Sequence, residues 1–270
     1  MSYDPTRPAA FFDEYGEREW SRFDDGRSSP VSFEVHRHYL RRFVCPRDRV
    51  LDVGAGPGRF AIELARLGAR VTVSDVSRVQ VALNERKLRE ARLEQAVEER
   101  LVADVTDLRH FQDGHFDATV CYGGPLSYAL DRAPQAAAEL VRVTRPGGHV
   151  LASAMSLVGA FAEELRTVLT LPVEVNDEII ATGYLDARSG GHVELRLFRS
   201  TELRALFEER GCAVVAVSAS NLNTAVEREQ YAGLDEPLRE ALVRWQVELC
   251  AEPGAVAASP HILVVARTPA

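Results

Sequence analysis

Residues 50–60 read VLDVGAGPGRF, a hydrophobic run that leads directly into three closely spaced glycines. The pattern predicts a buried strand that turns sharply into a helix, because glycine tolerates positive φ values and leaves room for a ligand beside the backbone. The dinucleotide-binding fingerprint is G-x-G-x-x-G, whereas Gly54, Gly56 and Gly58 form G-x-G-x-G. Because ligands of open parallel sheets bind at the carboxyl ends of the strands, this turn predicts a cofactor site.

Acidic residues near the turn distinguish between cofactors. A dinucleotide places its pyrophosphate at the helix N-terminus, and Asp52, two positions before Gly54, would oppose that negative charge. Asp52 suits a cationic ligand that carries an ammonium and a sulfonium group. Asp75 ends the next predicted strand, where a carboxylate accepts hydrogen bonds from ribose hydroxyls. Asp104 follows the third predicted strand and either accepts a hydrogen bond from an adenine amino group or forms a turn.

Strands and helices alternate along the first part of the chain. Two helices, at 9–22 and 32–43, are expected before the first strand, with the loop DDGRSSP between them. Strands follow at 49–53, 70–74, 98–103, 116–122 and 149–154, and the helices between them at 59–67, 79–91 and 133–143. This alternation predicts a doubly wound α/β fold, a parallel sheet with helices on both faces.

The alternation stops after Met155. Residues 156–199 contain a helix and then two segments of strand character, 178–184 and 192–198, around the turn ARSGG. Such a length is unusual for a simple connection, so we expect an inserted hairpin that covers a ligand. The core pattern then resumes with helices at 200–210 and 237–251 and strands at 212–218 and 261–266. The predicted organisation is an N-terminal helical cap at 1–47, a core at 48–155 and 200–270, and an inserted lid or substrate-binding segment at 156–199.

Composition narrows the class of protein. The 270 residues are 46% hydrophobic, which suffices for one large domain. The net charge of −8 argues against a broad basic surface for nucleic acid. None of the four cysteines forms a C-x-x-C pair, so neither a metal site nor a disulfide framework is expected. Reduced thiols, no apolar segment of membrane-spanning length and no signal-peptide core in the first residues predict a cytoplasmic protein.

Five segments occur together in a fixed order: VLDVGAGPGRFAIELA (50–65), VTVSDVS (71–77), ADVTDL (103–108), FDATVCYGGPLSY (116–128) and ELVRVTRPGGHVLAS (139–153). With these segments the chain resembles the class I S-adenosylmethionine-dependent methyltransferases. The resemblance implies a Rossmann-like, doubly wound sheet of seven mostly parallel strands with an antiparallel last strand, and S-adenosyl-L-methionine as the cofactor. It places the glycines against the methionine part, Asp75 on the ribose, and Asp104 with Val105 at the adenine.

The complete set of residues expected to bind the cofactor is Asp52, Gly54, Ala55, Gly56, Gly58, Arg59, Asp75, Val76, Ser77, Asp104, Val105, Cys121, Tyr122 and Gly123. The segment CYGGPLSY, at 121–128, faces the reacting methyl group in this family. It lacks the Asn/Asp-Pro-Pro-aromatic motif of DNA amino-methyltransferases and the Pro-Cys pair of carbon-5 enzymes. We therefore expect a small-molecule O, N or C nucleophile as the acceptor, methylated by in-line displacement, and no nucleic-acid partner.

Methyl transfer depends mainly on alignment of the reactants and exclusion of water, so a strong general base is not required. If a base takes part, the candidates are Tyr15, His36 and Tyr128, expected to line the pocket, although residues of these types usually have packing roles. Two alternatives stay open: a non-catalytic module that binds S-adenosylmethionine and has a regulatory role, and, less favoured by the glycine spacing and Asp52, an NAD-type oxidoreductase. The oligomeric state, monomer or homodimer, also stays open.

Overall fold

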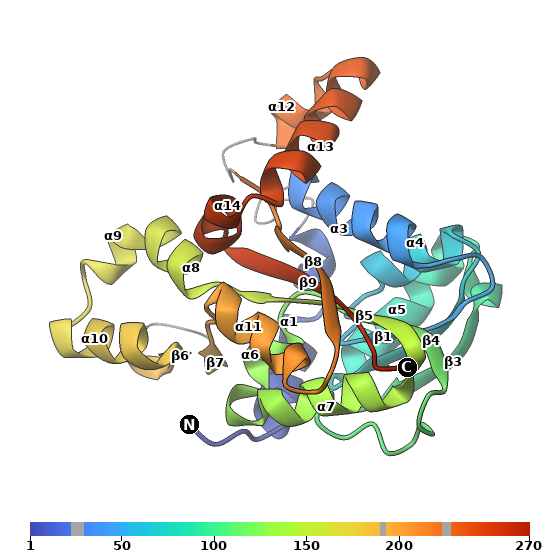
Figure 1. The fold of residues 1–270 in the computed structure, drawn as a ribbon, viewed down its shortest axis with the longest axis horizontal. Helices are drawn as coiled ribbons and strands as arrows, with labels where there is room; N and C mark the ends of the chain where they lie inside the picture. The colour runs from blue at the N-terminus through green and yellow to red at the C-terminus, as the bar shows by residue number, and fades with distance from the viewer. Residues whose placement is uncertain (23–29, 190–192, 223–227) are drawn as a thin grey trace.

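The computed structural model describes residues 1–22, 30–189, 193–222 and 228–270. Its main sheet has seven strands in the order β3-β2-β1-β4-β5-β9-β8 (Figure 1). The strands are β1 (Arg49–Val53), β2 (Arg70–Asp75), β3 (Val97–Val102), β4 (Phe116–Cys121), β5 (Thr144–Met155), β8 (Ala213–Ala219) and β9 (His261–Arg267). Strands β1 to β5 pair in parallel, and β9 runs antiparallel to both of its neighbours. The expected Rossmann-like sheet, with its antiparallel last strand, is confirmed.

Helices cover both faces of this sheet, and the strands supply a hydrophobic core to each face. Leu51 and Val53 of β1 enter one core, which α7 and α11 complete, while Val50 enters the other, beneath α3 and α4. This alternation follows from the period of two in a strand buried on both faces. The helices of the body are α3 (Pro30–Phe43), α4 (Arg59–Arg66), α5 (Arg78–Glu90), α6 (Pro125–Tyr128), α7 (Ala133–Val143), α11 (Ser200–Glu208), α12 (Arg228–Ala232), α13 (Glu236–Cys250) and α14 (Pro253–Ala258).

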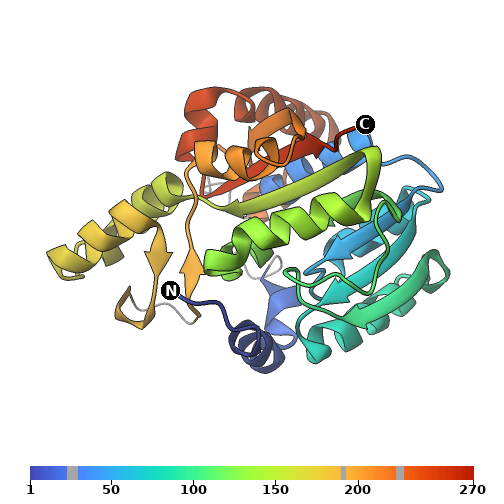
Figure 2. The same cartoon turned by 60° about the horizontal axis from the view of Figure 1, so that its bottom comes forward.

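The N-terminal residues form two short helices, α1 (Thr6–Tyr15) and α2 (Arg18–Ser21), where the sequence predicts one. Gly16, with φ of +54°, separates them. Helix α1 packs against α5, next to the carboxyl ends of the parallel strands (Figure 2). The predicted loop DDGRSSP lies almost entirely outside the described residues.

Between β5 and α11 the chain forms an arm that projects from the body (Figures 1 and 2). The arm contains α8 (Leu157–Glu163), α9 (Leu165–Val168), α10 (Val173–Thr182), and a small hairpin of β6 (Tyr184–Leu185) with β7 (Leu195–Arg196). The prediction of a strand at 178–184 is wrong, because residues up to Thr182 continue α10. Val175 and Ile179, four residues apart, face one core cluster together, so helical spacing prevails over the β-propensity of these side chains. The predicted strand at 192–198 begins outside the described residues.

Candidate functional site

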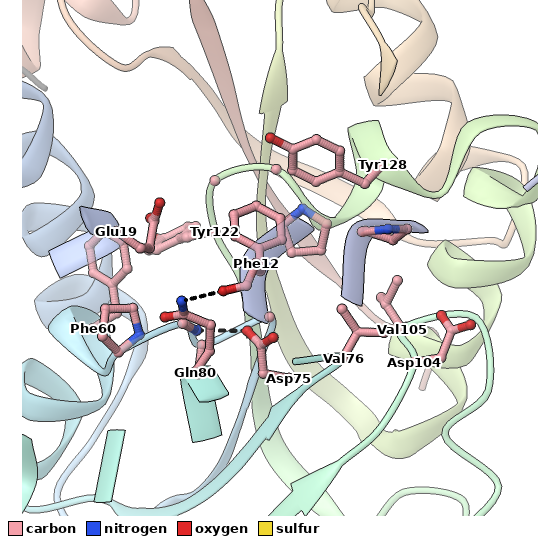
Figure 3. Close-up of a pocket in the computed structure, with 18 of the residues that line it drawn as sticks. Phe12, Glu19, Phe60, Asp75, Val76, Gln80, Asp104, Val105, Tyr122 and Tyr128 are labelled. Carbon is pink, nitrogen blue, oxygen red and sulfur yellow. Dashed lines mark hydrogen bonds between the residues drawn. The ribbon is translucent and has the colours of Figure 1, made fainter. Parts of the chain in front are cut away.

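A pocket opens at the carboxyl ends of β1 to β4 and holds about 870 Å³ of empty space, its open mouth included. Its walls come from the glycine turn after β1, the ends of β2 and β3, the loop after β4, and the N-terminal segment. The lining residues are Tyr3, Pro8, Phe12, Glu19, Arg22, Gly54, Ala55, Gly56, Pro57, Arg59, Phe60, Asp75, Val76, Gln80, Ala103, Asp104, Val105, Tyr122, Gly123, Gly124, Pro125 and Tyr128. Figure 3 shows Phe12 between Tyr128 and the row formed by Asp75, Val76 and Val105.

The glycine turn adopts a conformation that other residues rarely accept. Gly54, Gly56 and Gly58 have φ values of +65°, +52° and +99°. A Cβ atom on Gly54 would lie 2.2 Å from Cγ of Pro125, because the loop after β4 packs directly against the turn. Two of the motifs in the sequence resemblance, 50–65 and 116–128, therefore form one continuous wall of the pocket.

Asp75, at the end of β2, holds the turn in place. Its Oδ2 accepts a hydrogen bond from the Gly56 N–H at 2.8 Å, and its Oδ1 accepts one from the Ser77 N–H at 2.9 Å. Burial is the main cause that raises the pKa of Asp75 to about 6, and the charges of Glu19 and Asp13 also raise it. Each carboxylate oxygen has a second lone pair, so the side chain can still accept hydrogen bonds from a bound diol.

Asp52 lies behind the glycine turn and outside the pocket lining, with 2% of its surface exposed. Its Oδ2 has no hydrogen-bond partner among the described residues. Burial, and then the charge of Asp75, raise the pKa of Asp52 to about 7. The neighbouring Cys121 is also buried outside the lining, and burial raises the pKa of its thiol. A protonated, enclosed thiol is a packing group and not a nucleophile.

Asp104 and Val105 follow β3 and line the opposite end of the pocket. Oδ1 of Asp104 accepts hydrogen bonds from the Tyr3 hydroxyl at 2.9 Å and from the Thr106 N–H at 2.8 Å. A turn-forming role and a pocket-lining role, which the sequence leaves as alternatives, therefore coexist in this residue.

The N-terminal segment covers the pocket, a role that the sequence does not reveal. Gln80 Nε2 donates to the carbonyl oxygens of Phe12 and Gly16, both at 3.0 Å. The Ser77 hydroxyl donates to Oδ1 of Asp13 at 2.5 Å. From α2, Glu19 lies over the turn, where a Cβ on Gly56 would be 3.8 Å from its Cγ. These contacts tie α1 and α2 to the end of β2 and to the start of α5.

Arg59 and Arg22 bring positive charge to the same side of the pocket as Glu19. The guanidinium of Arg59 lies 3.9 Å from the centre of the Trp20 ring and donates to the Trp20 carbonyl at 2.8 Å. Arg22 forms an ion pair with Glu19 at 2.6 Å. Both signs of charge thus occur beside the glycine turn, as a ligand with an ammonium and a carboxylate requires.

Aromatic side chains form the wall near the loop after β4. Tyr122 makes edge-to-face contacts with His36 and Phe60, at 4.6 and 5.0 Å between ring centres. Tyr128 packs edge-on against Phe12 at 5.4 Å. Burial is the largest cause that raises the pKa of Tyr128 to about 12, so its phenol stays protonated at neutral pH.

His36 lies behind this wall and does not line the pocket. Its Nδ1 is 2.7 Å from the Ser32 carbonyl oxygen, which assigns the ring proton to Nδ1, and its Nε2 is 3.3 Å from the Ser153 hydroxyl. Burial lowers the pKa of His36 to about 4, so the ring is neutral. Ser153 Oγ accepts the Gly123 N–H at 2.8 Å, so His36 affects the pocket indirectly, through Ser153 and through its ring contact with Tyr122.

The structure places the residues expected from the sequence in two groups. Those that line the pocket are Gly54, Ala55, Gly56, Arg59, Asp75, Val76, Asp104, Val105, Tyr122, Gly123 and Tyr128. Those outside the lining are Asp52, Gly58, Ser77, Cys121, Tyr15 and His36. Tyr15 instead stacks on Phe11 at 5.4 Å. No described residue of 156–199 lines the pocket, and the expected role of this segment as a lid or substrate-binding segment stays a prediction. Residues of the N-terminal segment, among them Tyr3, Phe12 and Glu19, line the pocket instead.

The sequence of residues 50–148 matches the model of a family described as a methyltransferase domain. The match spans the glycine turn, the ends of β2 and β3, and the loop after β4. This part of the chain is a methyltransferase domain of the kind found in class I S-adenosylmethionine-dependent methyltransferases. S-adenosylmethionine is the cofactor of the family, as the glycine turn and its acidic neighbours indicate.

Similar proteins share mainly this methyltransferase domain. The demethylmenaquinone methyltransferase of Beutenbergia cavernae is 32% identical over 153 residues, which cover 52% of this chain and 58% of that protein. The chain spans between 41% and 58% of the length of the first curated relatives it matches. A methyltransferase solved with the Trm112 activator of Haloferax volcanii has a TM-score of 0.65 at 18% identity, over 97% of each chain. The [4+2]-cyclase SpnF has a TM-score of 0.60 at 22% identity, over 91% of this chain and 85% of that one. At these identities the two structures show the fold alone.

Nowhere among the described residues do three His, Cys, Asp or Glu side chains come together in a group that could hold a metal ion. In the same part of the chain, none of the helices has the length and hydrophobicity to cross a membrane.

Proposed function

We propose that this protein transfers the methyl group of S-adenosylmethionine to an O, N or C nucleophile of a small molecule. The observation that carries the proposal is the single pocket wall formed by the glycine turn, Asp75, and the Asp104–Val105 pair. When bound, S-adenosylmethionine supplies an electrophilic methyl group that an acceptor displaces in line.

The residues present fit this cofactor along its whole length. Glu19 suits the ammonium of the methionine part, and Arg59 suits its carboxylate. Asp75 would accept the ribose hydroxyls, with its orientation fixed by the Gly56 and Ser77 amides. Asp104 would accept the adenine amino group. The buried Asp52, whose pKa is raised to about 7, would become more fully ionised beside a cationic ligand, whereas a pyrophosphate would oppose that ionisation.

Catalysis in this pocket would rest on positioning and exclusion of water. Phe12, Phe60 and Tyr122 provide apolar surface around the loop after β4, which strengthens electrostatic interactions within the site. Tyr128 keeps its proton at neutral pH, so it would hold the acceptor by hydrogen bonding and not act as a base. His36 would act indirectly, because it holds Ser153, which in turn accepts the Gly123 N–H.

The enclosure of the pocket supports the proposal that the acceptor is a small molecule. Small molecules are also the substrates named for relatives such as the demethylmenaquinone methyltransferase. Four further points remain proposals from the sequence: no nucleic-acid partner, a monomeric or homodimeric state, a cytoplasmic location, and an acceptor-binding role for residues 156–199. A non-catalytic, cofactor-binding regulatory role is the alternative, and the fold shared with a cyclase adds a related one, chemistry other than methyl transfer.

Thermal melting of the purified protein with S-adenosylmethionine, S-adenosylhomocysteine or NAD tests the cofactor. Ligand at about 100 times its Kd should stabilise the fold by about 2.7 kcal/mol, so we expect a clear rise with the two adenosyl compounds. A rise with NAD alone would overturn the proposal. Incubation with S-adenosylmethionine and a panel of phenols, amines and carboxylic acids then tests the reaction, because S-adenosylhomocysteine forms only when a methyl group leaves.

A further inference from the structure

Tyr3 makes a contact that the proposed cofactor site does not yet explain. Its hydroxyl donates to Oδ1 of Asp104, the same oxygen that accepts the Thr106 N–H. Within the described residues no hydrogen bond reaches Oδ2 of Asp104. One carboxylate oxygen is thus held by two protein donors, while the other stays available to a ligand donor in the pocket that both residues line.

Tyr3 is itself held in position. Its backbone N–H donates to Oδ1 of Asp131 at 2.9 Å, and three residues later the chain enters α1 at Thr6, whose N–H donates to Oδ1 of Asp4 at 3.0 Å. Burial, followed by the charge of Asp104, raises the pKa of the Tyr3 phenol. The hydroxyl is therefore a permanent donor at neutral pH and can hold Asp104 in one orientation.

We propose that Tyr3 is a positioning residue that orients Asp104 to receive the 6-amino group of the purine, so that the N-terminal segment contributes to recognition of the base. The inference rests on the proposed function, since it needs an adenosyl ligand in the pocket. A carboxylate that is fixed before binding loses little freedom when the ligand arrives. Without the Tyr3 hydroxyl, the Thr106 N–H would be the one donor left to the Asp104 carboxylate among the described residues, so this carboxylate would be held less firmly and would bind the amino group less well.

The test compares two ligands on Tyr3→Phe, which removes only the hydroxyl. One is S-adenosylhomocysteine, and the other is its 6-deamino analogue, in which a hydrogen replaces the 6-amino group. We expect the Kd for S-adenosylhomocysteine to rise about tenfold, the scale of a hydrogen bond to a charged group, while the Kd for the analogue changes less than about twofold. Tyr184→Phe, a matched change on the arm hairpin, should leave both Kd values at the wild-type level.

Asp104→Asn sharpens the test, because Tyr3 is proposed to act only through Asp104. Combined with Asp104→Asn, the change Tyr3→Phe should cause no further loss of selectivity for the 6-amino group. An equal loss for both ligands would overturn the inference in favour of a general packing role. Unchanged or tighter binding of S-adenosylhomocysteine by Tyr3→Phe would also overturn it. If the wild-type protein binds neither ligand, the proposed function itself fails. If the wild-type protein binds and the variant binds equally well, only the role of Tyr3 fails.

Discussion

The carboxyl ends of β1 to β4 and the arm at 157–199 differ in how firmly their residues are held by the rest of the protein. At the strand ends, backbone and side chains are fixed from several directions: Gly54 against Pro125, Asp75 by two amides, and Asp104 by Tyr3. Along the arm, hydrophobic side chains face solvent, with Leu169 at 76% and Val173 at 72% exposure. The arm is fixed mainly at its root.

The root of the arm shows where its position is determined. The Leu157 N–H donates to the Phe198 carbonyl at 2.9 Å, so the two ends of the arm meet beside β5. Gly159 packs so closely there that a Cβ would lie 1.9 Å from the Ser259 carbonyl oxygen. The comparison indicates that cofactor binding tolerates little change at the strand ends, whereas the arm can vary along its length while its root stays in place.

The change Gly54→Ala should have the largest effect. A side chain at φ of +65° is strained, and the added Cβ would collide with Pro125. We expect a loss of about 2–4 kcal/mol in the free energy of unfolding, from strain and overpacking together, and a loss of more than about 100-fold in affinity for S-adenosylhomocysteine. Denaturant unfolding and calorimetric titration measure the two quantities.

Gly254→Ala is the matched control, since a Cβ there meets no atom within 4 Å and the residue lies within α14. It should leave affinity unchanged and stability within about 1 kcal/mol of wild type. Wild-type affinity in Gly54→Ala would show that the turn is more adaptable than its contacts indicate, and would remove the contrast with the arm.

Asp75→Asn should act on binding more than on folding. The amide keeps one acceptor oxygen but loses the second, so it cannot accept from both ribose hydroxyls while holding the turn. We expect the Kd for S-adenosylhomocysteine to rise about 30-fold, as for loss of a charge-assisted hydrogen bond or two. Asp177→Asn, on α10 of the arm, should leave the Kd unchanged. Equal Kd values for the two variants would contradict the ribose role of Asp75.

Binding should also depend on pH through Asp75, whose pKa is raised to about 6. The carboxylate is the acceptor of hydrogen bonds, and protonation removes it as pH falls. The Kd for S-adenosylhomocysteine should therefore vary little above about pH 7 and rise by up to about tenfold per unit below pH 6. His36 and His261 stay neutral over this range, because burial lowers their pKa values to about 4 and 3. If the Kd of Asp75→Asn for S-adenosylhomocysteine rises as steeply with falling pH, the pH dependence belongs to another group, and Asp52 is the first to examine.

The body of the fold could be predicted because each of its signals is local. Strand β1 and helix α7 occupy the predicted residues 49–53 and 133–143, since buried strands and amphipathic helices carry their periodicity within a few residues. The hairpin prediction for the arm failed at residues 178–182, where β-branched side chains favour a strand locally. Packing of Val175 and Ile179 against Leu157 and Leu197, distant in sequence, makes this segment helical.

The site could be predicted only where a motif accompanies a strand end. Gly54, Asp75 and Asp104 each follow a predicted strand directly, and all three line the pocket. Tyr3, Phe12 and Glu19 reach the same pocket from an N-terminal segment whose sequence gives no sign of where it packs. Gln80, the partner of Phe12, lies 68 residues away along the chain, and Asp104, the partner of Tyr3, lies 101 residues away, so no short-range pattern could relate them.

The smallest effect is expected from Leu169→Ala on the arm. Because 76% of this residue is exposed, the free energy of unfolding should change by less than about 0.5 kcal/mol. The same substitution at Leu140, fully buried in α7, should cost about 2–5 kcal/mol, and the pair measures the contrast between arm and body directly. A loss above about 1 kcal/mol for Leu169→Ala would mean that this surface is covered in solution. Repeating the unfolding at several protein concentrations would then test for a second copy of the chain, since only association makes stability concentration-dependent.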